Sequence, residues 1–139
     1  MDCLFCRIAR KELSAETVYE NEGAVAILDM RPLALGHTMV LPKTHAETIL
    51  DLPATDAPKI WEALVGTTRI LKKAFSPDGF TIGINHGRAS GQAIDHLHIH
   101  IIPRWQGDGG TSIHGVVKNA PHESVAETAR RIRSAAHGS

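Results

Sequence analysis

The sequence predicts an α+β fold, with an antiparallel sheet of about five strands and one long central helix. Short apolar runs of strand character are separated by turn residues, as at 17–20 and 24–28 around the turn at 21–23. Apolar residues follow helical spacing through 55–75. Strands joined by short turns, together with one strong helix, are typical of this fold class.

Each expected element lies between chain-breaking residues. Pro42 stops the third strand, and the Ser-Pro-Asp-Gly run at 76–79 ends the long helix. Strands are expected at 17–20, 24–28, 37–41, 80–85 and 96–103. Helices are expected at 5–9, at 55–75 with Thr55 or Asp56 as N-cap, and as a weaker pattern at 123–135. The Gly-rich segment 86–92 and residues 104–121 are expected to be irregular.

The composition narrows the classes of protein and partner. The 139 residues are 42% hydrophobic and 22% charged, which fits one globular domain. Lys and Arg number 15, as do Asp and Glu, and this balance argues against a nucleic-acid partner. No apolar run approaches the roughly 18 residues of a membrane span, and the N-terminus lacks signal-peptide features. We therefore expect a cytoplasmic protein without a membrane partner.

Three histidines alternate with aliphatic residues at 96–101. On a strand, His96, His98 and His100 would share one face, with the aliphatic residues turned to the core. The first and third would lie roughly 13 Å apart at the rise of a strand, too far for a single metal ion. The spacing suits separate tasks along a line, because neutral imidazole can be a nucleophile, a proton donor or a ligand.

The only two cysteines, Cys3 and Cys6, form a Cys-x-x-Cys pair. In an intracellular protein such a pair is typical of a redox couple or of half a metal site. No thioredoxin-like βαβ pattern surrounds it, which disfavours the redox interpretation.

Several motifs together resemble the histidine triad family, in its Hint-like branch of nucleotide hydrolases. Besides the triad, the matching segments are Leu4-Phe5-x-x-Ile8, Arg10-Lys11-Glu12, Leu28-Asp29-Met30-Arg31-Pro32, Gly36-His37-x-x-Val40-Leu41-Pro42-Lys43-x-His45, Asn85 and Gly91-Gln92. The resemblance implies a single domain over 1–139, with a zinc-binding segment at 1–10 and a C-terminal loop and helix at 104–139. It also implies a homodimer.

The resemblance assigns catalytic roles to three histidines. His98 corresponds to the nucleophile that attacks the α-phosphorus of a nucleotide and forms a nucleotidyl-histidine. His100 corresponds to the residue at the phosphate oxygens and the leaving group. His37 resembles an upstream histidine that supports the site, although from sequence alone it could equally be a polar residue at a strand edge.

The resemblance also assigns the substrate-binding residues. Asp29 corresponds to the acceptor of the ribose hydroxyls. Asn85 corresponds to a phosphate-binding residue, and the Gly-rich loop containing Gly91, Gln92 and Ala93 would bring backbone N–H groups near the phosphate. Read without the resemblance, Asn85 is a turn residue. The apolar wall around the base corresponds to residues that could equally be core: Leu4, Phe5, Ile8, Ile27 and Met30.

Bacterial members of this family that carry the cysteines hold structural zinc with a Cys₂His₂ set. Here that set is Cys3, Cys6, His45 and His96. The alternative is two reduced cysteines without a ligand.

Two features depart from the Hint pattern and leave the leaving group open. Ala93 stands where that branch has Ser and the dinucleotide-hydrolase branch has Thr, so a hydroxyl near the phosphate is missing. The ending at 100–104 resembles the dinucleotide-polyphosphate branch. The expected activity is hydrolysis or transfer at the α-phosphate of purine nucleotides such as an adenosine phosphoramidate. The alternatives are dinucleoside polyphosphate hydrolysis and a purine-nucleotide-binding regulatory protein with incidental hydrolysis.

Overall fold

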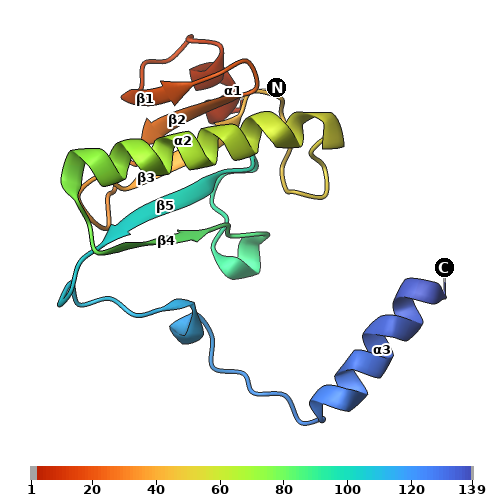
Figure 1. The fold of residues 1–139 in the computed structure, drawn as a ribbon. Helices are drawn as coiled ribbons and strands as arrows, with labels where there is room; N and C mark the ends of the chain where they lie inside the picture. Colours follow the sequence, from red (N-terminus) through yellow and green to blue (C-terminus); the bar gives the residue numbers. More distant parts are fainter. Residues whose placement is uncertain (1–2, 139) are drawn as a thin grey trace. The chain divides into compact units, whose positions relative to one another are not determined.

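The computed structural model describes residues 3–138, which form two compact units, one up to Gly109 and one from Gly110 onward (Figure 1). The helices of the first unit are α1 (Leu4–Ala9) and α2 (Ala57–Phe75). Its strands are β1 (Thr17–Glu20), β2 (Ala24–Leu28), β3 (Thr38–Pro42), β4 (Gly79–Gly83) and β5 (Ile99–Arg104). The second unit carries the helix α3 (Val125–His137). Short 3₁₀ turns lie at Ala54–Asp56, Arg88–Ser90 and Ile113–Gly115.

The five strands form one antiparallel sheet in the order β1-β2-β3-β5-β4, which confirms the predicted fold class. In Figure 1, α2 runs across one face of this sheet. The register places Ile27 opposite Met39, and Met39 opposite His100. The centre of the sheet thus brings the end of β2, the start of β3 and the triad segment together.

Two hydrophobic cores lie on opposite faces of the sheet, because successive strand residues point to opposite sides. The larger core packs α2 against β2, β3 and β5 through Ile60, Ala63, Leu71, Ala24, Ala26, Val40, Ile99 and Ile101. The smaller core packs Phe5 of α1 against Val25, Ile27, Met39 and Leu41. The side chains of His98 and Phe5 meet edge to face, with ring centroids 5.2 Å apart, so His98 lies on the α1 side.

The long helix agrees with the prediction in position but not in its capping. Residues 54–56 form a 3₁₀ turn, and Asp56 occupies the N-cap position without a side-chain capping bond. Pro58 in the first turn needs no N–H donor there, which suits this start. The helix ends at Ser76, whose left-handed backbone (φ 48°) breaks the helix.

The triad strand begins later than predicted. Regular pairing starts at Ile99 opposite Val40, so His96 and His98 precede β5. Pro42 has no N–H to continue the ladder, and the Leu97 N–H donates instead to the Ala46 carbonyl at 2.7 Å. The predicted alternation still holds, because His98 lies on the α1 side while Ile99 and Ile101 pack in the larger core.

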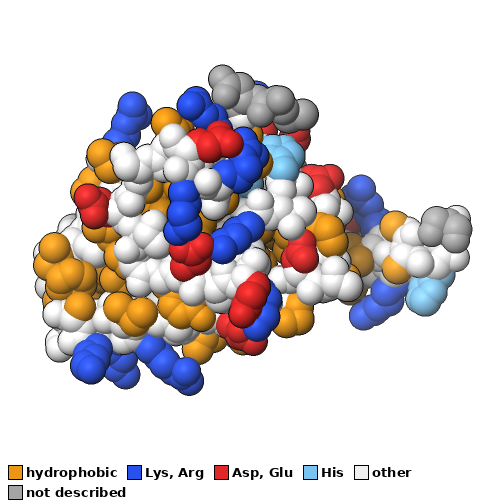
Figure 2. Space-filling model, turned by 90° about the horizontal axis from the view of Figure 1, so that it is seen from above, with side chains coloured by type: hydrophobic (Ala, Val, Ile, Leu, Met, Phe, Trp, Pro, Cys, Tyr) orange, Lys and Arg blue, Asp and Glu red, His pale blue; other side chains and the backbone are white. Residues whose placement is uncertain are grey.

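The other boundaries that differ shift by one or two residues. The third strand runs to Pro42, the fourth ends at Gly83 rather than at 85, and the C-terminal helix starts at Val125 and continues to His137. None of the helices described at 3–138 is long and apolar enough to cross a membrane. Basic and acidic side chains are interspersed near the middle of the face in Figure 2, in line with the balanced composition.

Candidate active site and metal centre

His98 presents one ring nitrogen with a free electron pair. Its Nδ1 lies 2.7 Å from the backbone carbonyl of His96, so Nδ1 carries the proton and donates it. The side chain is 8% exposed and packs against Phe5. In its neutral form the ring therefore has its lone pair at Nε2, as a nucleophile needs.

His37 and His100 form a hydrogen-bonded pair beside His98. The Nε2 of His37 lies 2.9 Å from Nδ1 of His100, and the rings of His98 and His100 have centroids 5.1 Å apart. Burial lowers the pKa of both paired histidines, and the Asp29 carboxylate only partly opposes this effect. Burial therefore favours the neutral form of both imidazoles.

Asp29 directly follows β2 and turns its carboxylate toward the paired histidines. One oxygen, Oδ1, accepts the Arg31 N–H at 2.8 Å. The other, Oδ2, lies 3.5 Å from Nε2 of His37 and 3.9 Å from Nδ1 of His100. The loop is closed by the Asp29 N–H, which donates to the His37 carbonyl at 2.9 Å. The β2–β3 loop thus holds Asp29 and His37 together, and an adjoining cavity of about 460 Å³ is bordered by both and by Leu33.

The loop at 86–92 is shaped by Gln92. The buried Gln92 amide accepts the Gly87 N–H at 2.8 Å and donates to the carbonyls of Glu47 and Ile94 at 2.7 and 3.1 Å. Gly91 adopts φ +102°, a conformation that favours glycine, and lies beside the Asn85 amide. Gln92 therefore uses its side chain on the backbone, and its predicted contact with substrate stays a prediction.

Asn85 and Ala93 remain open to a ligand. Both are exposed, and no hydrogen-bond partner of the Asn85 side chain or of the Ala93 N–H lies among residues 3–138. These two groups lie on either side of the loop that Gln92 holds. Exposed amide donors of this kind can bind phosphate oxygens.

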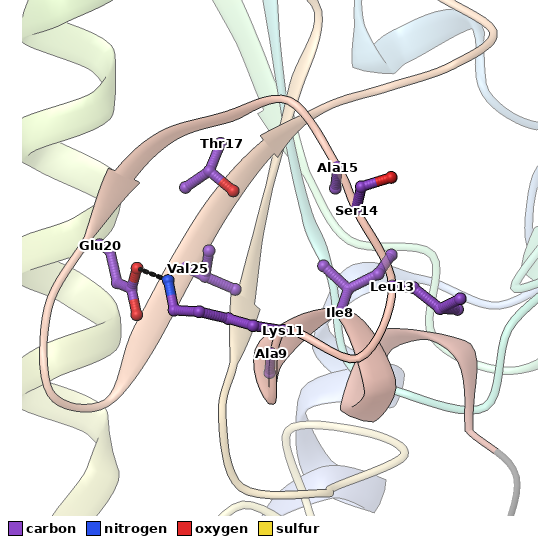
Figure 3. A pocket seen from close by; sticks show the side chains of 9 residues that line it. All are labelled: Ile8, Ala9, Lys11, Leu13, Ser14, Ala15, Thr17, Glu20 and Val25. Atoms are coloured by element: carbon purple, nitrogen blue, oxygen red, sulfur yellow. Dashed lines mark hydrogen bonds and ion pairs between the residues drawn. The ribbon is translucent and has the colours of Figure 1, made fainter.

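The predicted apolar wall divides into three groups. Phe5 and Ile27 are buried in the smaller core. Ile8 borders a cavity of about 280 Å³ between the α1–β1 loop and β2, shown in Figure 3 with Lys11 and Glu20 at its rim. Leu4 and Met30 are 45% and 85% exposed. Because Phe5 and Ile27 are buried, each can belong both to the core and to the wall around the base.

Cys3, Cys6, His45 and His96 converge as predicted. Their ligand atoms all lie within 4.8 Å of one another. The His96 Nδ1 is 3.3 Å from Cys3 Sγ and 3.5 Å from Cys6 Sγ, and the His45 Nδ1 is 3.2 Å from Cys6 Sγ. A tetrahedral zinc site with ordinary bond lengths separates its sulfur and nitrogen ligands by roughly 3.5 Å, so the cluster fits such an ion.

The electrostatics of the cluster also fit a metal. The His96 Nε2–H donates to the Pro42 carbonyl at 2.8 Å, which turns the lone pair of Nδ1 toward the thiols. Burial lowers the pKa of His96 and keeps the ring neutral. Burial, followed by the neighbouring Cys3, raises the pKa of the Cys6 thiol, an effect that a bound cation would reverse.

Two functional groups could not be identified from the residue types. These are the Pro42 carbonyl and the Leu33 N–H, which lies 3.1 Å from Nδ1 of His37. Both are backbone groups: every residue has the carbonyl, and every residue except proline has the N–H.

Comparison with known proteins places the chain among related sequences and structures. The family model of the HIT domain matches residues 10–107. An uncharacterised HIT-like protein of Methanocaldococcus jannaschii is 41% identical over 123 residues, covering 88% of this chain and 95% of that protein. An adenylylsulfatase of Arabidopsis thaliana is 37% identical over 107 residues, covering 77% of this chain and 54% of that protein. The crystal structure of a HIT family protein from Bacillus anthracis has a TM-score of 0.85 at 32% identity, covering 99% of this chain and 96% of that chain.

Proposed function

The chain belongs to the histidine triad (HIT) family, and on this premise we propose that it is a nucleotide hydrolase or transferase acting through His98. The substrates are derivatives of purine nucleoside monophosphates, attacked at the α-phosphate. The observation that carries the proposal is the 2.7 Å bond from His98 Nδ1 to the His96 carbonyl, which leaves Nε2 free to attack.

The reaction proceeds in two displacements. The Nε2 electron pair forms a bond to the α-phosphorus, and the bond from phosphorus to the leaving group breaks with its electron pair on the leaving atom. Water, or another acceptor in a transfer, then attacks phosphorus, the N–P bond breaks, and the electron pair returns to Nε2. In hydrolysis, one water proton passes to solvent. The His96 carbonyl stabilises the positively charged ring of the intermediate through the Nδ1–H.

The surrounding groups bind the substrate. Asp29 accepts hydrogen bonds from the ribose hydroxyls, and Asn85 and the Ala93 N–H bind phosphate oxygens. The base lies against Leu4, Phe5, Ile8, Ile27 and Met30. Gly91 and Gln92 give the phosphate loop its shape, and His100 and His37 face the leaving group.

A substitution of the nucleophile tests this function. We predict that His98→Asn still binds nucleotide but loses turnover by several powers of ten, because Asn can form a hydrogen bond but cannot form the intermediate. Turnover of AMP derivatives and equilibrium binding of AMP would be measured, with exposed His122→Asn as the matched control. Rapid quench with labelled substrate should trap an acid-labile adduct on the wild type. Near-normal turnover in His98→Asn would show that another group attacks phosphorus.

Zinc is proposed as a structural ion held by Cys3, Cys6, His45 and His96. When bound, it supplies a positive charge that keeps both thiols ionised and fixes α1 to the segment that carries the triad. None of the proposed chemical steps uses it. The donor set, two thiols and two imidazoles whose ligand atoms lie within 4.8 Å of one another, supports this assignment.

A homodimer is proposed from the edge of the sheet at β4. β4 ends the strand order, and Ile82 on β4 and Trp61 on α2 are 42% and 66% exposed. A second copy would pair the edge strand and cover exposed apolar side chains. A monomer by light scattering at micromolar concentration would contradict it. The cytoplasmic location stays a prediction from the sequence.

A further inference from the structure

We propose that the backbone N–H of Leu33 fixes the tautomers of His37 and His100, so that the site favours leaving groups that depart as anions. This proposal rests on the proposed function and narrows its substrate class. The favoured substrates are mixed anhydrides of a nucleoside monophosphate, with a sulfate, phosphate or carboxylate leaving group. Phosphoramidates, which release an amine, are disfavoured.

The first step concerns the tautomer of His37. The Leu33 N–H lies 3.1 Å from Nδ1 of His37, and a backbone N–H is always a donor. Nδ1 must therefore be the acceptor, and the single proton of the neutral ring is on Nε2. The reverse tautomer would turn two donors toward each other in a side chain that is only 3% exposed. The Asp29 carboxylate, 3.5 Å from Nε2, favours the same tautomer.

The second step passes this constraint to His100. With its proton on Nε2, His37 donates to Nδ1 of His100 across 2.9 Å. His100 Nδ1 is thus an acceptor, and its own proton lies on Nε2. One main-chain group in the β2–β3 loop thereby determines which nitrogen of His100 carries the proton, although the two residues are 67 positions apart in the sequence.

The same constraint argues against a metal at this cluster. Ligand atoms of Asp29, His37 and His100 lie within 4.8 Å of one another, a spacing that could hold an ion. A metal would need the lone pair of His37 Nε2, and the ring would then have to place its proton on Nδ1, facing the Leu33 N–H. His37 and His100 therefore act as a hydrogen-bonded pair. In the cysteine-containing cluster, by contrast, no backbone N–H within residues 3–138 donates to His96 Nδ1, which faces the two thiols.

The tautomer of His100 determines how its Nε2–H can act on the leaving group. Its Nε2–H can donate a hydrogen bond to an oxygen that gains negative charge as the P–O bond breaks. Full transfer of that proton would leave an imidazolate unless Nδ1 gained a proton, and Nδ1 already faces the N–H of His37. An oxyanion departs with the electron pair of the P–O bond and needs no proton. An amine must be protonated on nitrogen before the P–N bond breaks.

The tautomers can be observed without any turnover. In protein labelled with ¹⁵N-histidine, long-range ¹H–¹⁵N spectra distinguish protonated from unprotonated ring nitrogens. We expect both His37 and His100 to carry the proton on Nε2, with signals assigned through His37→Gln and His100→Gln. A proton on Nδ1 of either ring in the wild type would overturn the proposal. Because no substrate is needed, this result is independent of whether the proposed function is correct.

The Leu33 N–H can be removed without changing a side chain. Replacing Leu33 by its α-hydroxy acid converts the amide to an ester, and the same replacement at Leu35 is the matched control, because its N–H makes no hydrogen bond within 3–138. The quantity measured is the ratio of kcat/KM for adenylyl sulfate to kcat/KM for adenosine phosphoramidate. We expect the ester at 33 to lower this ratio roughly five- to tenfold, the effect of about one hydrogen bond. The ester at 35 should leave the ratio unchanged.

The outcomes separate the two proposals. An unchanged ratio in the Leu33 ester, or an equal change in the Leu35 ester, would overturn the role of the Leu33 amide. Absence of turnover on both substrates, together with Nε2–H tautomers in the spectra, would overturn the proposed function and leave the tautomer assignment standing. A wild type more efficient on the phosphoramidate would overturn the substrate class.

Discussion

His96 and His98 are two residues apart, yet their rings carry the proton on different nitrogens. His96 donates Nε2–H to Pro42, and His98 donates Nδ1–H to the carbonyl of His96. The free nitrogens are therefore Nδ1 in one ring and Nε2 in the other. This difference lets one histidine face two thiols while its neighbour keeps a lone pair for phosphorus.

Ala93 bears on the same choice of leaving group. We predict that Ala93→Ser raises kcat/KM for an adenosine phosphoramidate roughly five- to tenfold and for a dinucleoside polyphosphate by less, because a hydroxyl can relay a proton to a departing amine. Steady-state kinetics on both substrates would measure it, with exposed Ala89→Ser as the control in the same loop. Equal gains on both substrates would show that position 93 does not select the leaving group.

Glu20 links folding stability to pH. Hydrogen bonds from Lys11 and Lys43 lower the pKa of this carboxylate from 4.5 to about 2. The contribution of Glu20 to the free energy of unfolding is thus complete above about pH 4.5 and is lost as the pH falls toward 2. Because the side chain is 31% exposed, Glu20→Gln should lower the free energy of unfolding at pH 7 by less than about 1 kcal/mol.

Urea unfolding of Glu20→Gln and wild type at pH 7, 4 and 2 would measure this effect. The difference between the two proteins should shrink steadily toward pH 2. Glu16→Gln, at an exposed position outside the ion pairs described, is the control and should behave as wild type. A difference that stays constant down to pH 2 would exclude the ion pair as its cause.

The residues that form the metal cluster were predictable, whereas the tautomers of the histidines were not. The resemblance to the histidine triad family was enough to predict that Cys3, Cys6, His45 and His96 form a cluster, which the structure brings together. The tautomers depend on main-chain groups of Leu33, His96 and Pro42, whose positions only the folded loops define.

At the scale of elements, the β2–β3 loop is held in place by a glycine. Gly36 adopts φ +83°, and a Cβ there would lie 2.8 Å from Cε2 of Phe75. The loop therefore passes directly over the end of α2 just before it delivers His37. The fold class was predictable from periodicity, but this contact was not, because it joins segments distant in sequence.

We predict that Gly36→Ala costs about 2–4 kcal/mol of stability, from left-handed backbone strain and the collision with Phe75. Gly107→Ala is the matched control, since Gly107 also has a positive φ (+76°) but open space around its Cβ position. It should show the backbone cost alone, about 1 kcal/mol. Denaturant unfolding of both variants would measure the difference. Equal losses would mean that Phe75 yields freely.

Gly36→Ala should also lower kcat, because His37 is the next residue.

The start of β5 gives a second lesson at this scale. Alternation predicted the faces of the histidines correctly, but the strand began three residues later, since a proline in the partner strand ended the ladder.

At the scale of the molecule, the Cys₂His₂ cluster joins α1, the segment after β3 and the segment before β5. We predict one zinc per chain, and its loss in Cys3→Ala combined with Cys6→Ala. Because metal binding adds to folding free energy, the double variant should melt roughly 5–10 °C lower. Elemental analysis and thermal unfolding would measure both effects, with His114→Asn combined with His122→Asn as the control. Zinc-free wild type purified without chelator would contradict the assignment.

The positions of these four ligands along the chain carry a consequence for the order of folding. Cys3 and His96 are 93 positions apart, and Cys6 and His45 are 39 apart. Closing such long loops is slow, so the complete cluster can form only after the sheet has assembled around it. An ion captured that late stabilises contacts absent from the transition state, and such contacts act mainly by slowing unfolding. Zinc would then lengthen the lifetime of the native protein while hardly changing the rate at which a new chain reaches it.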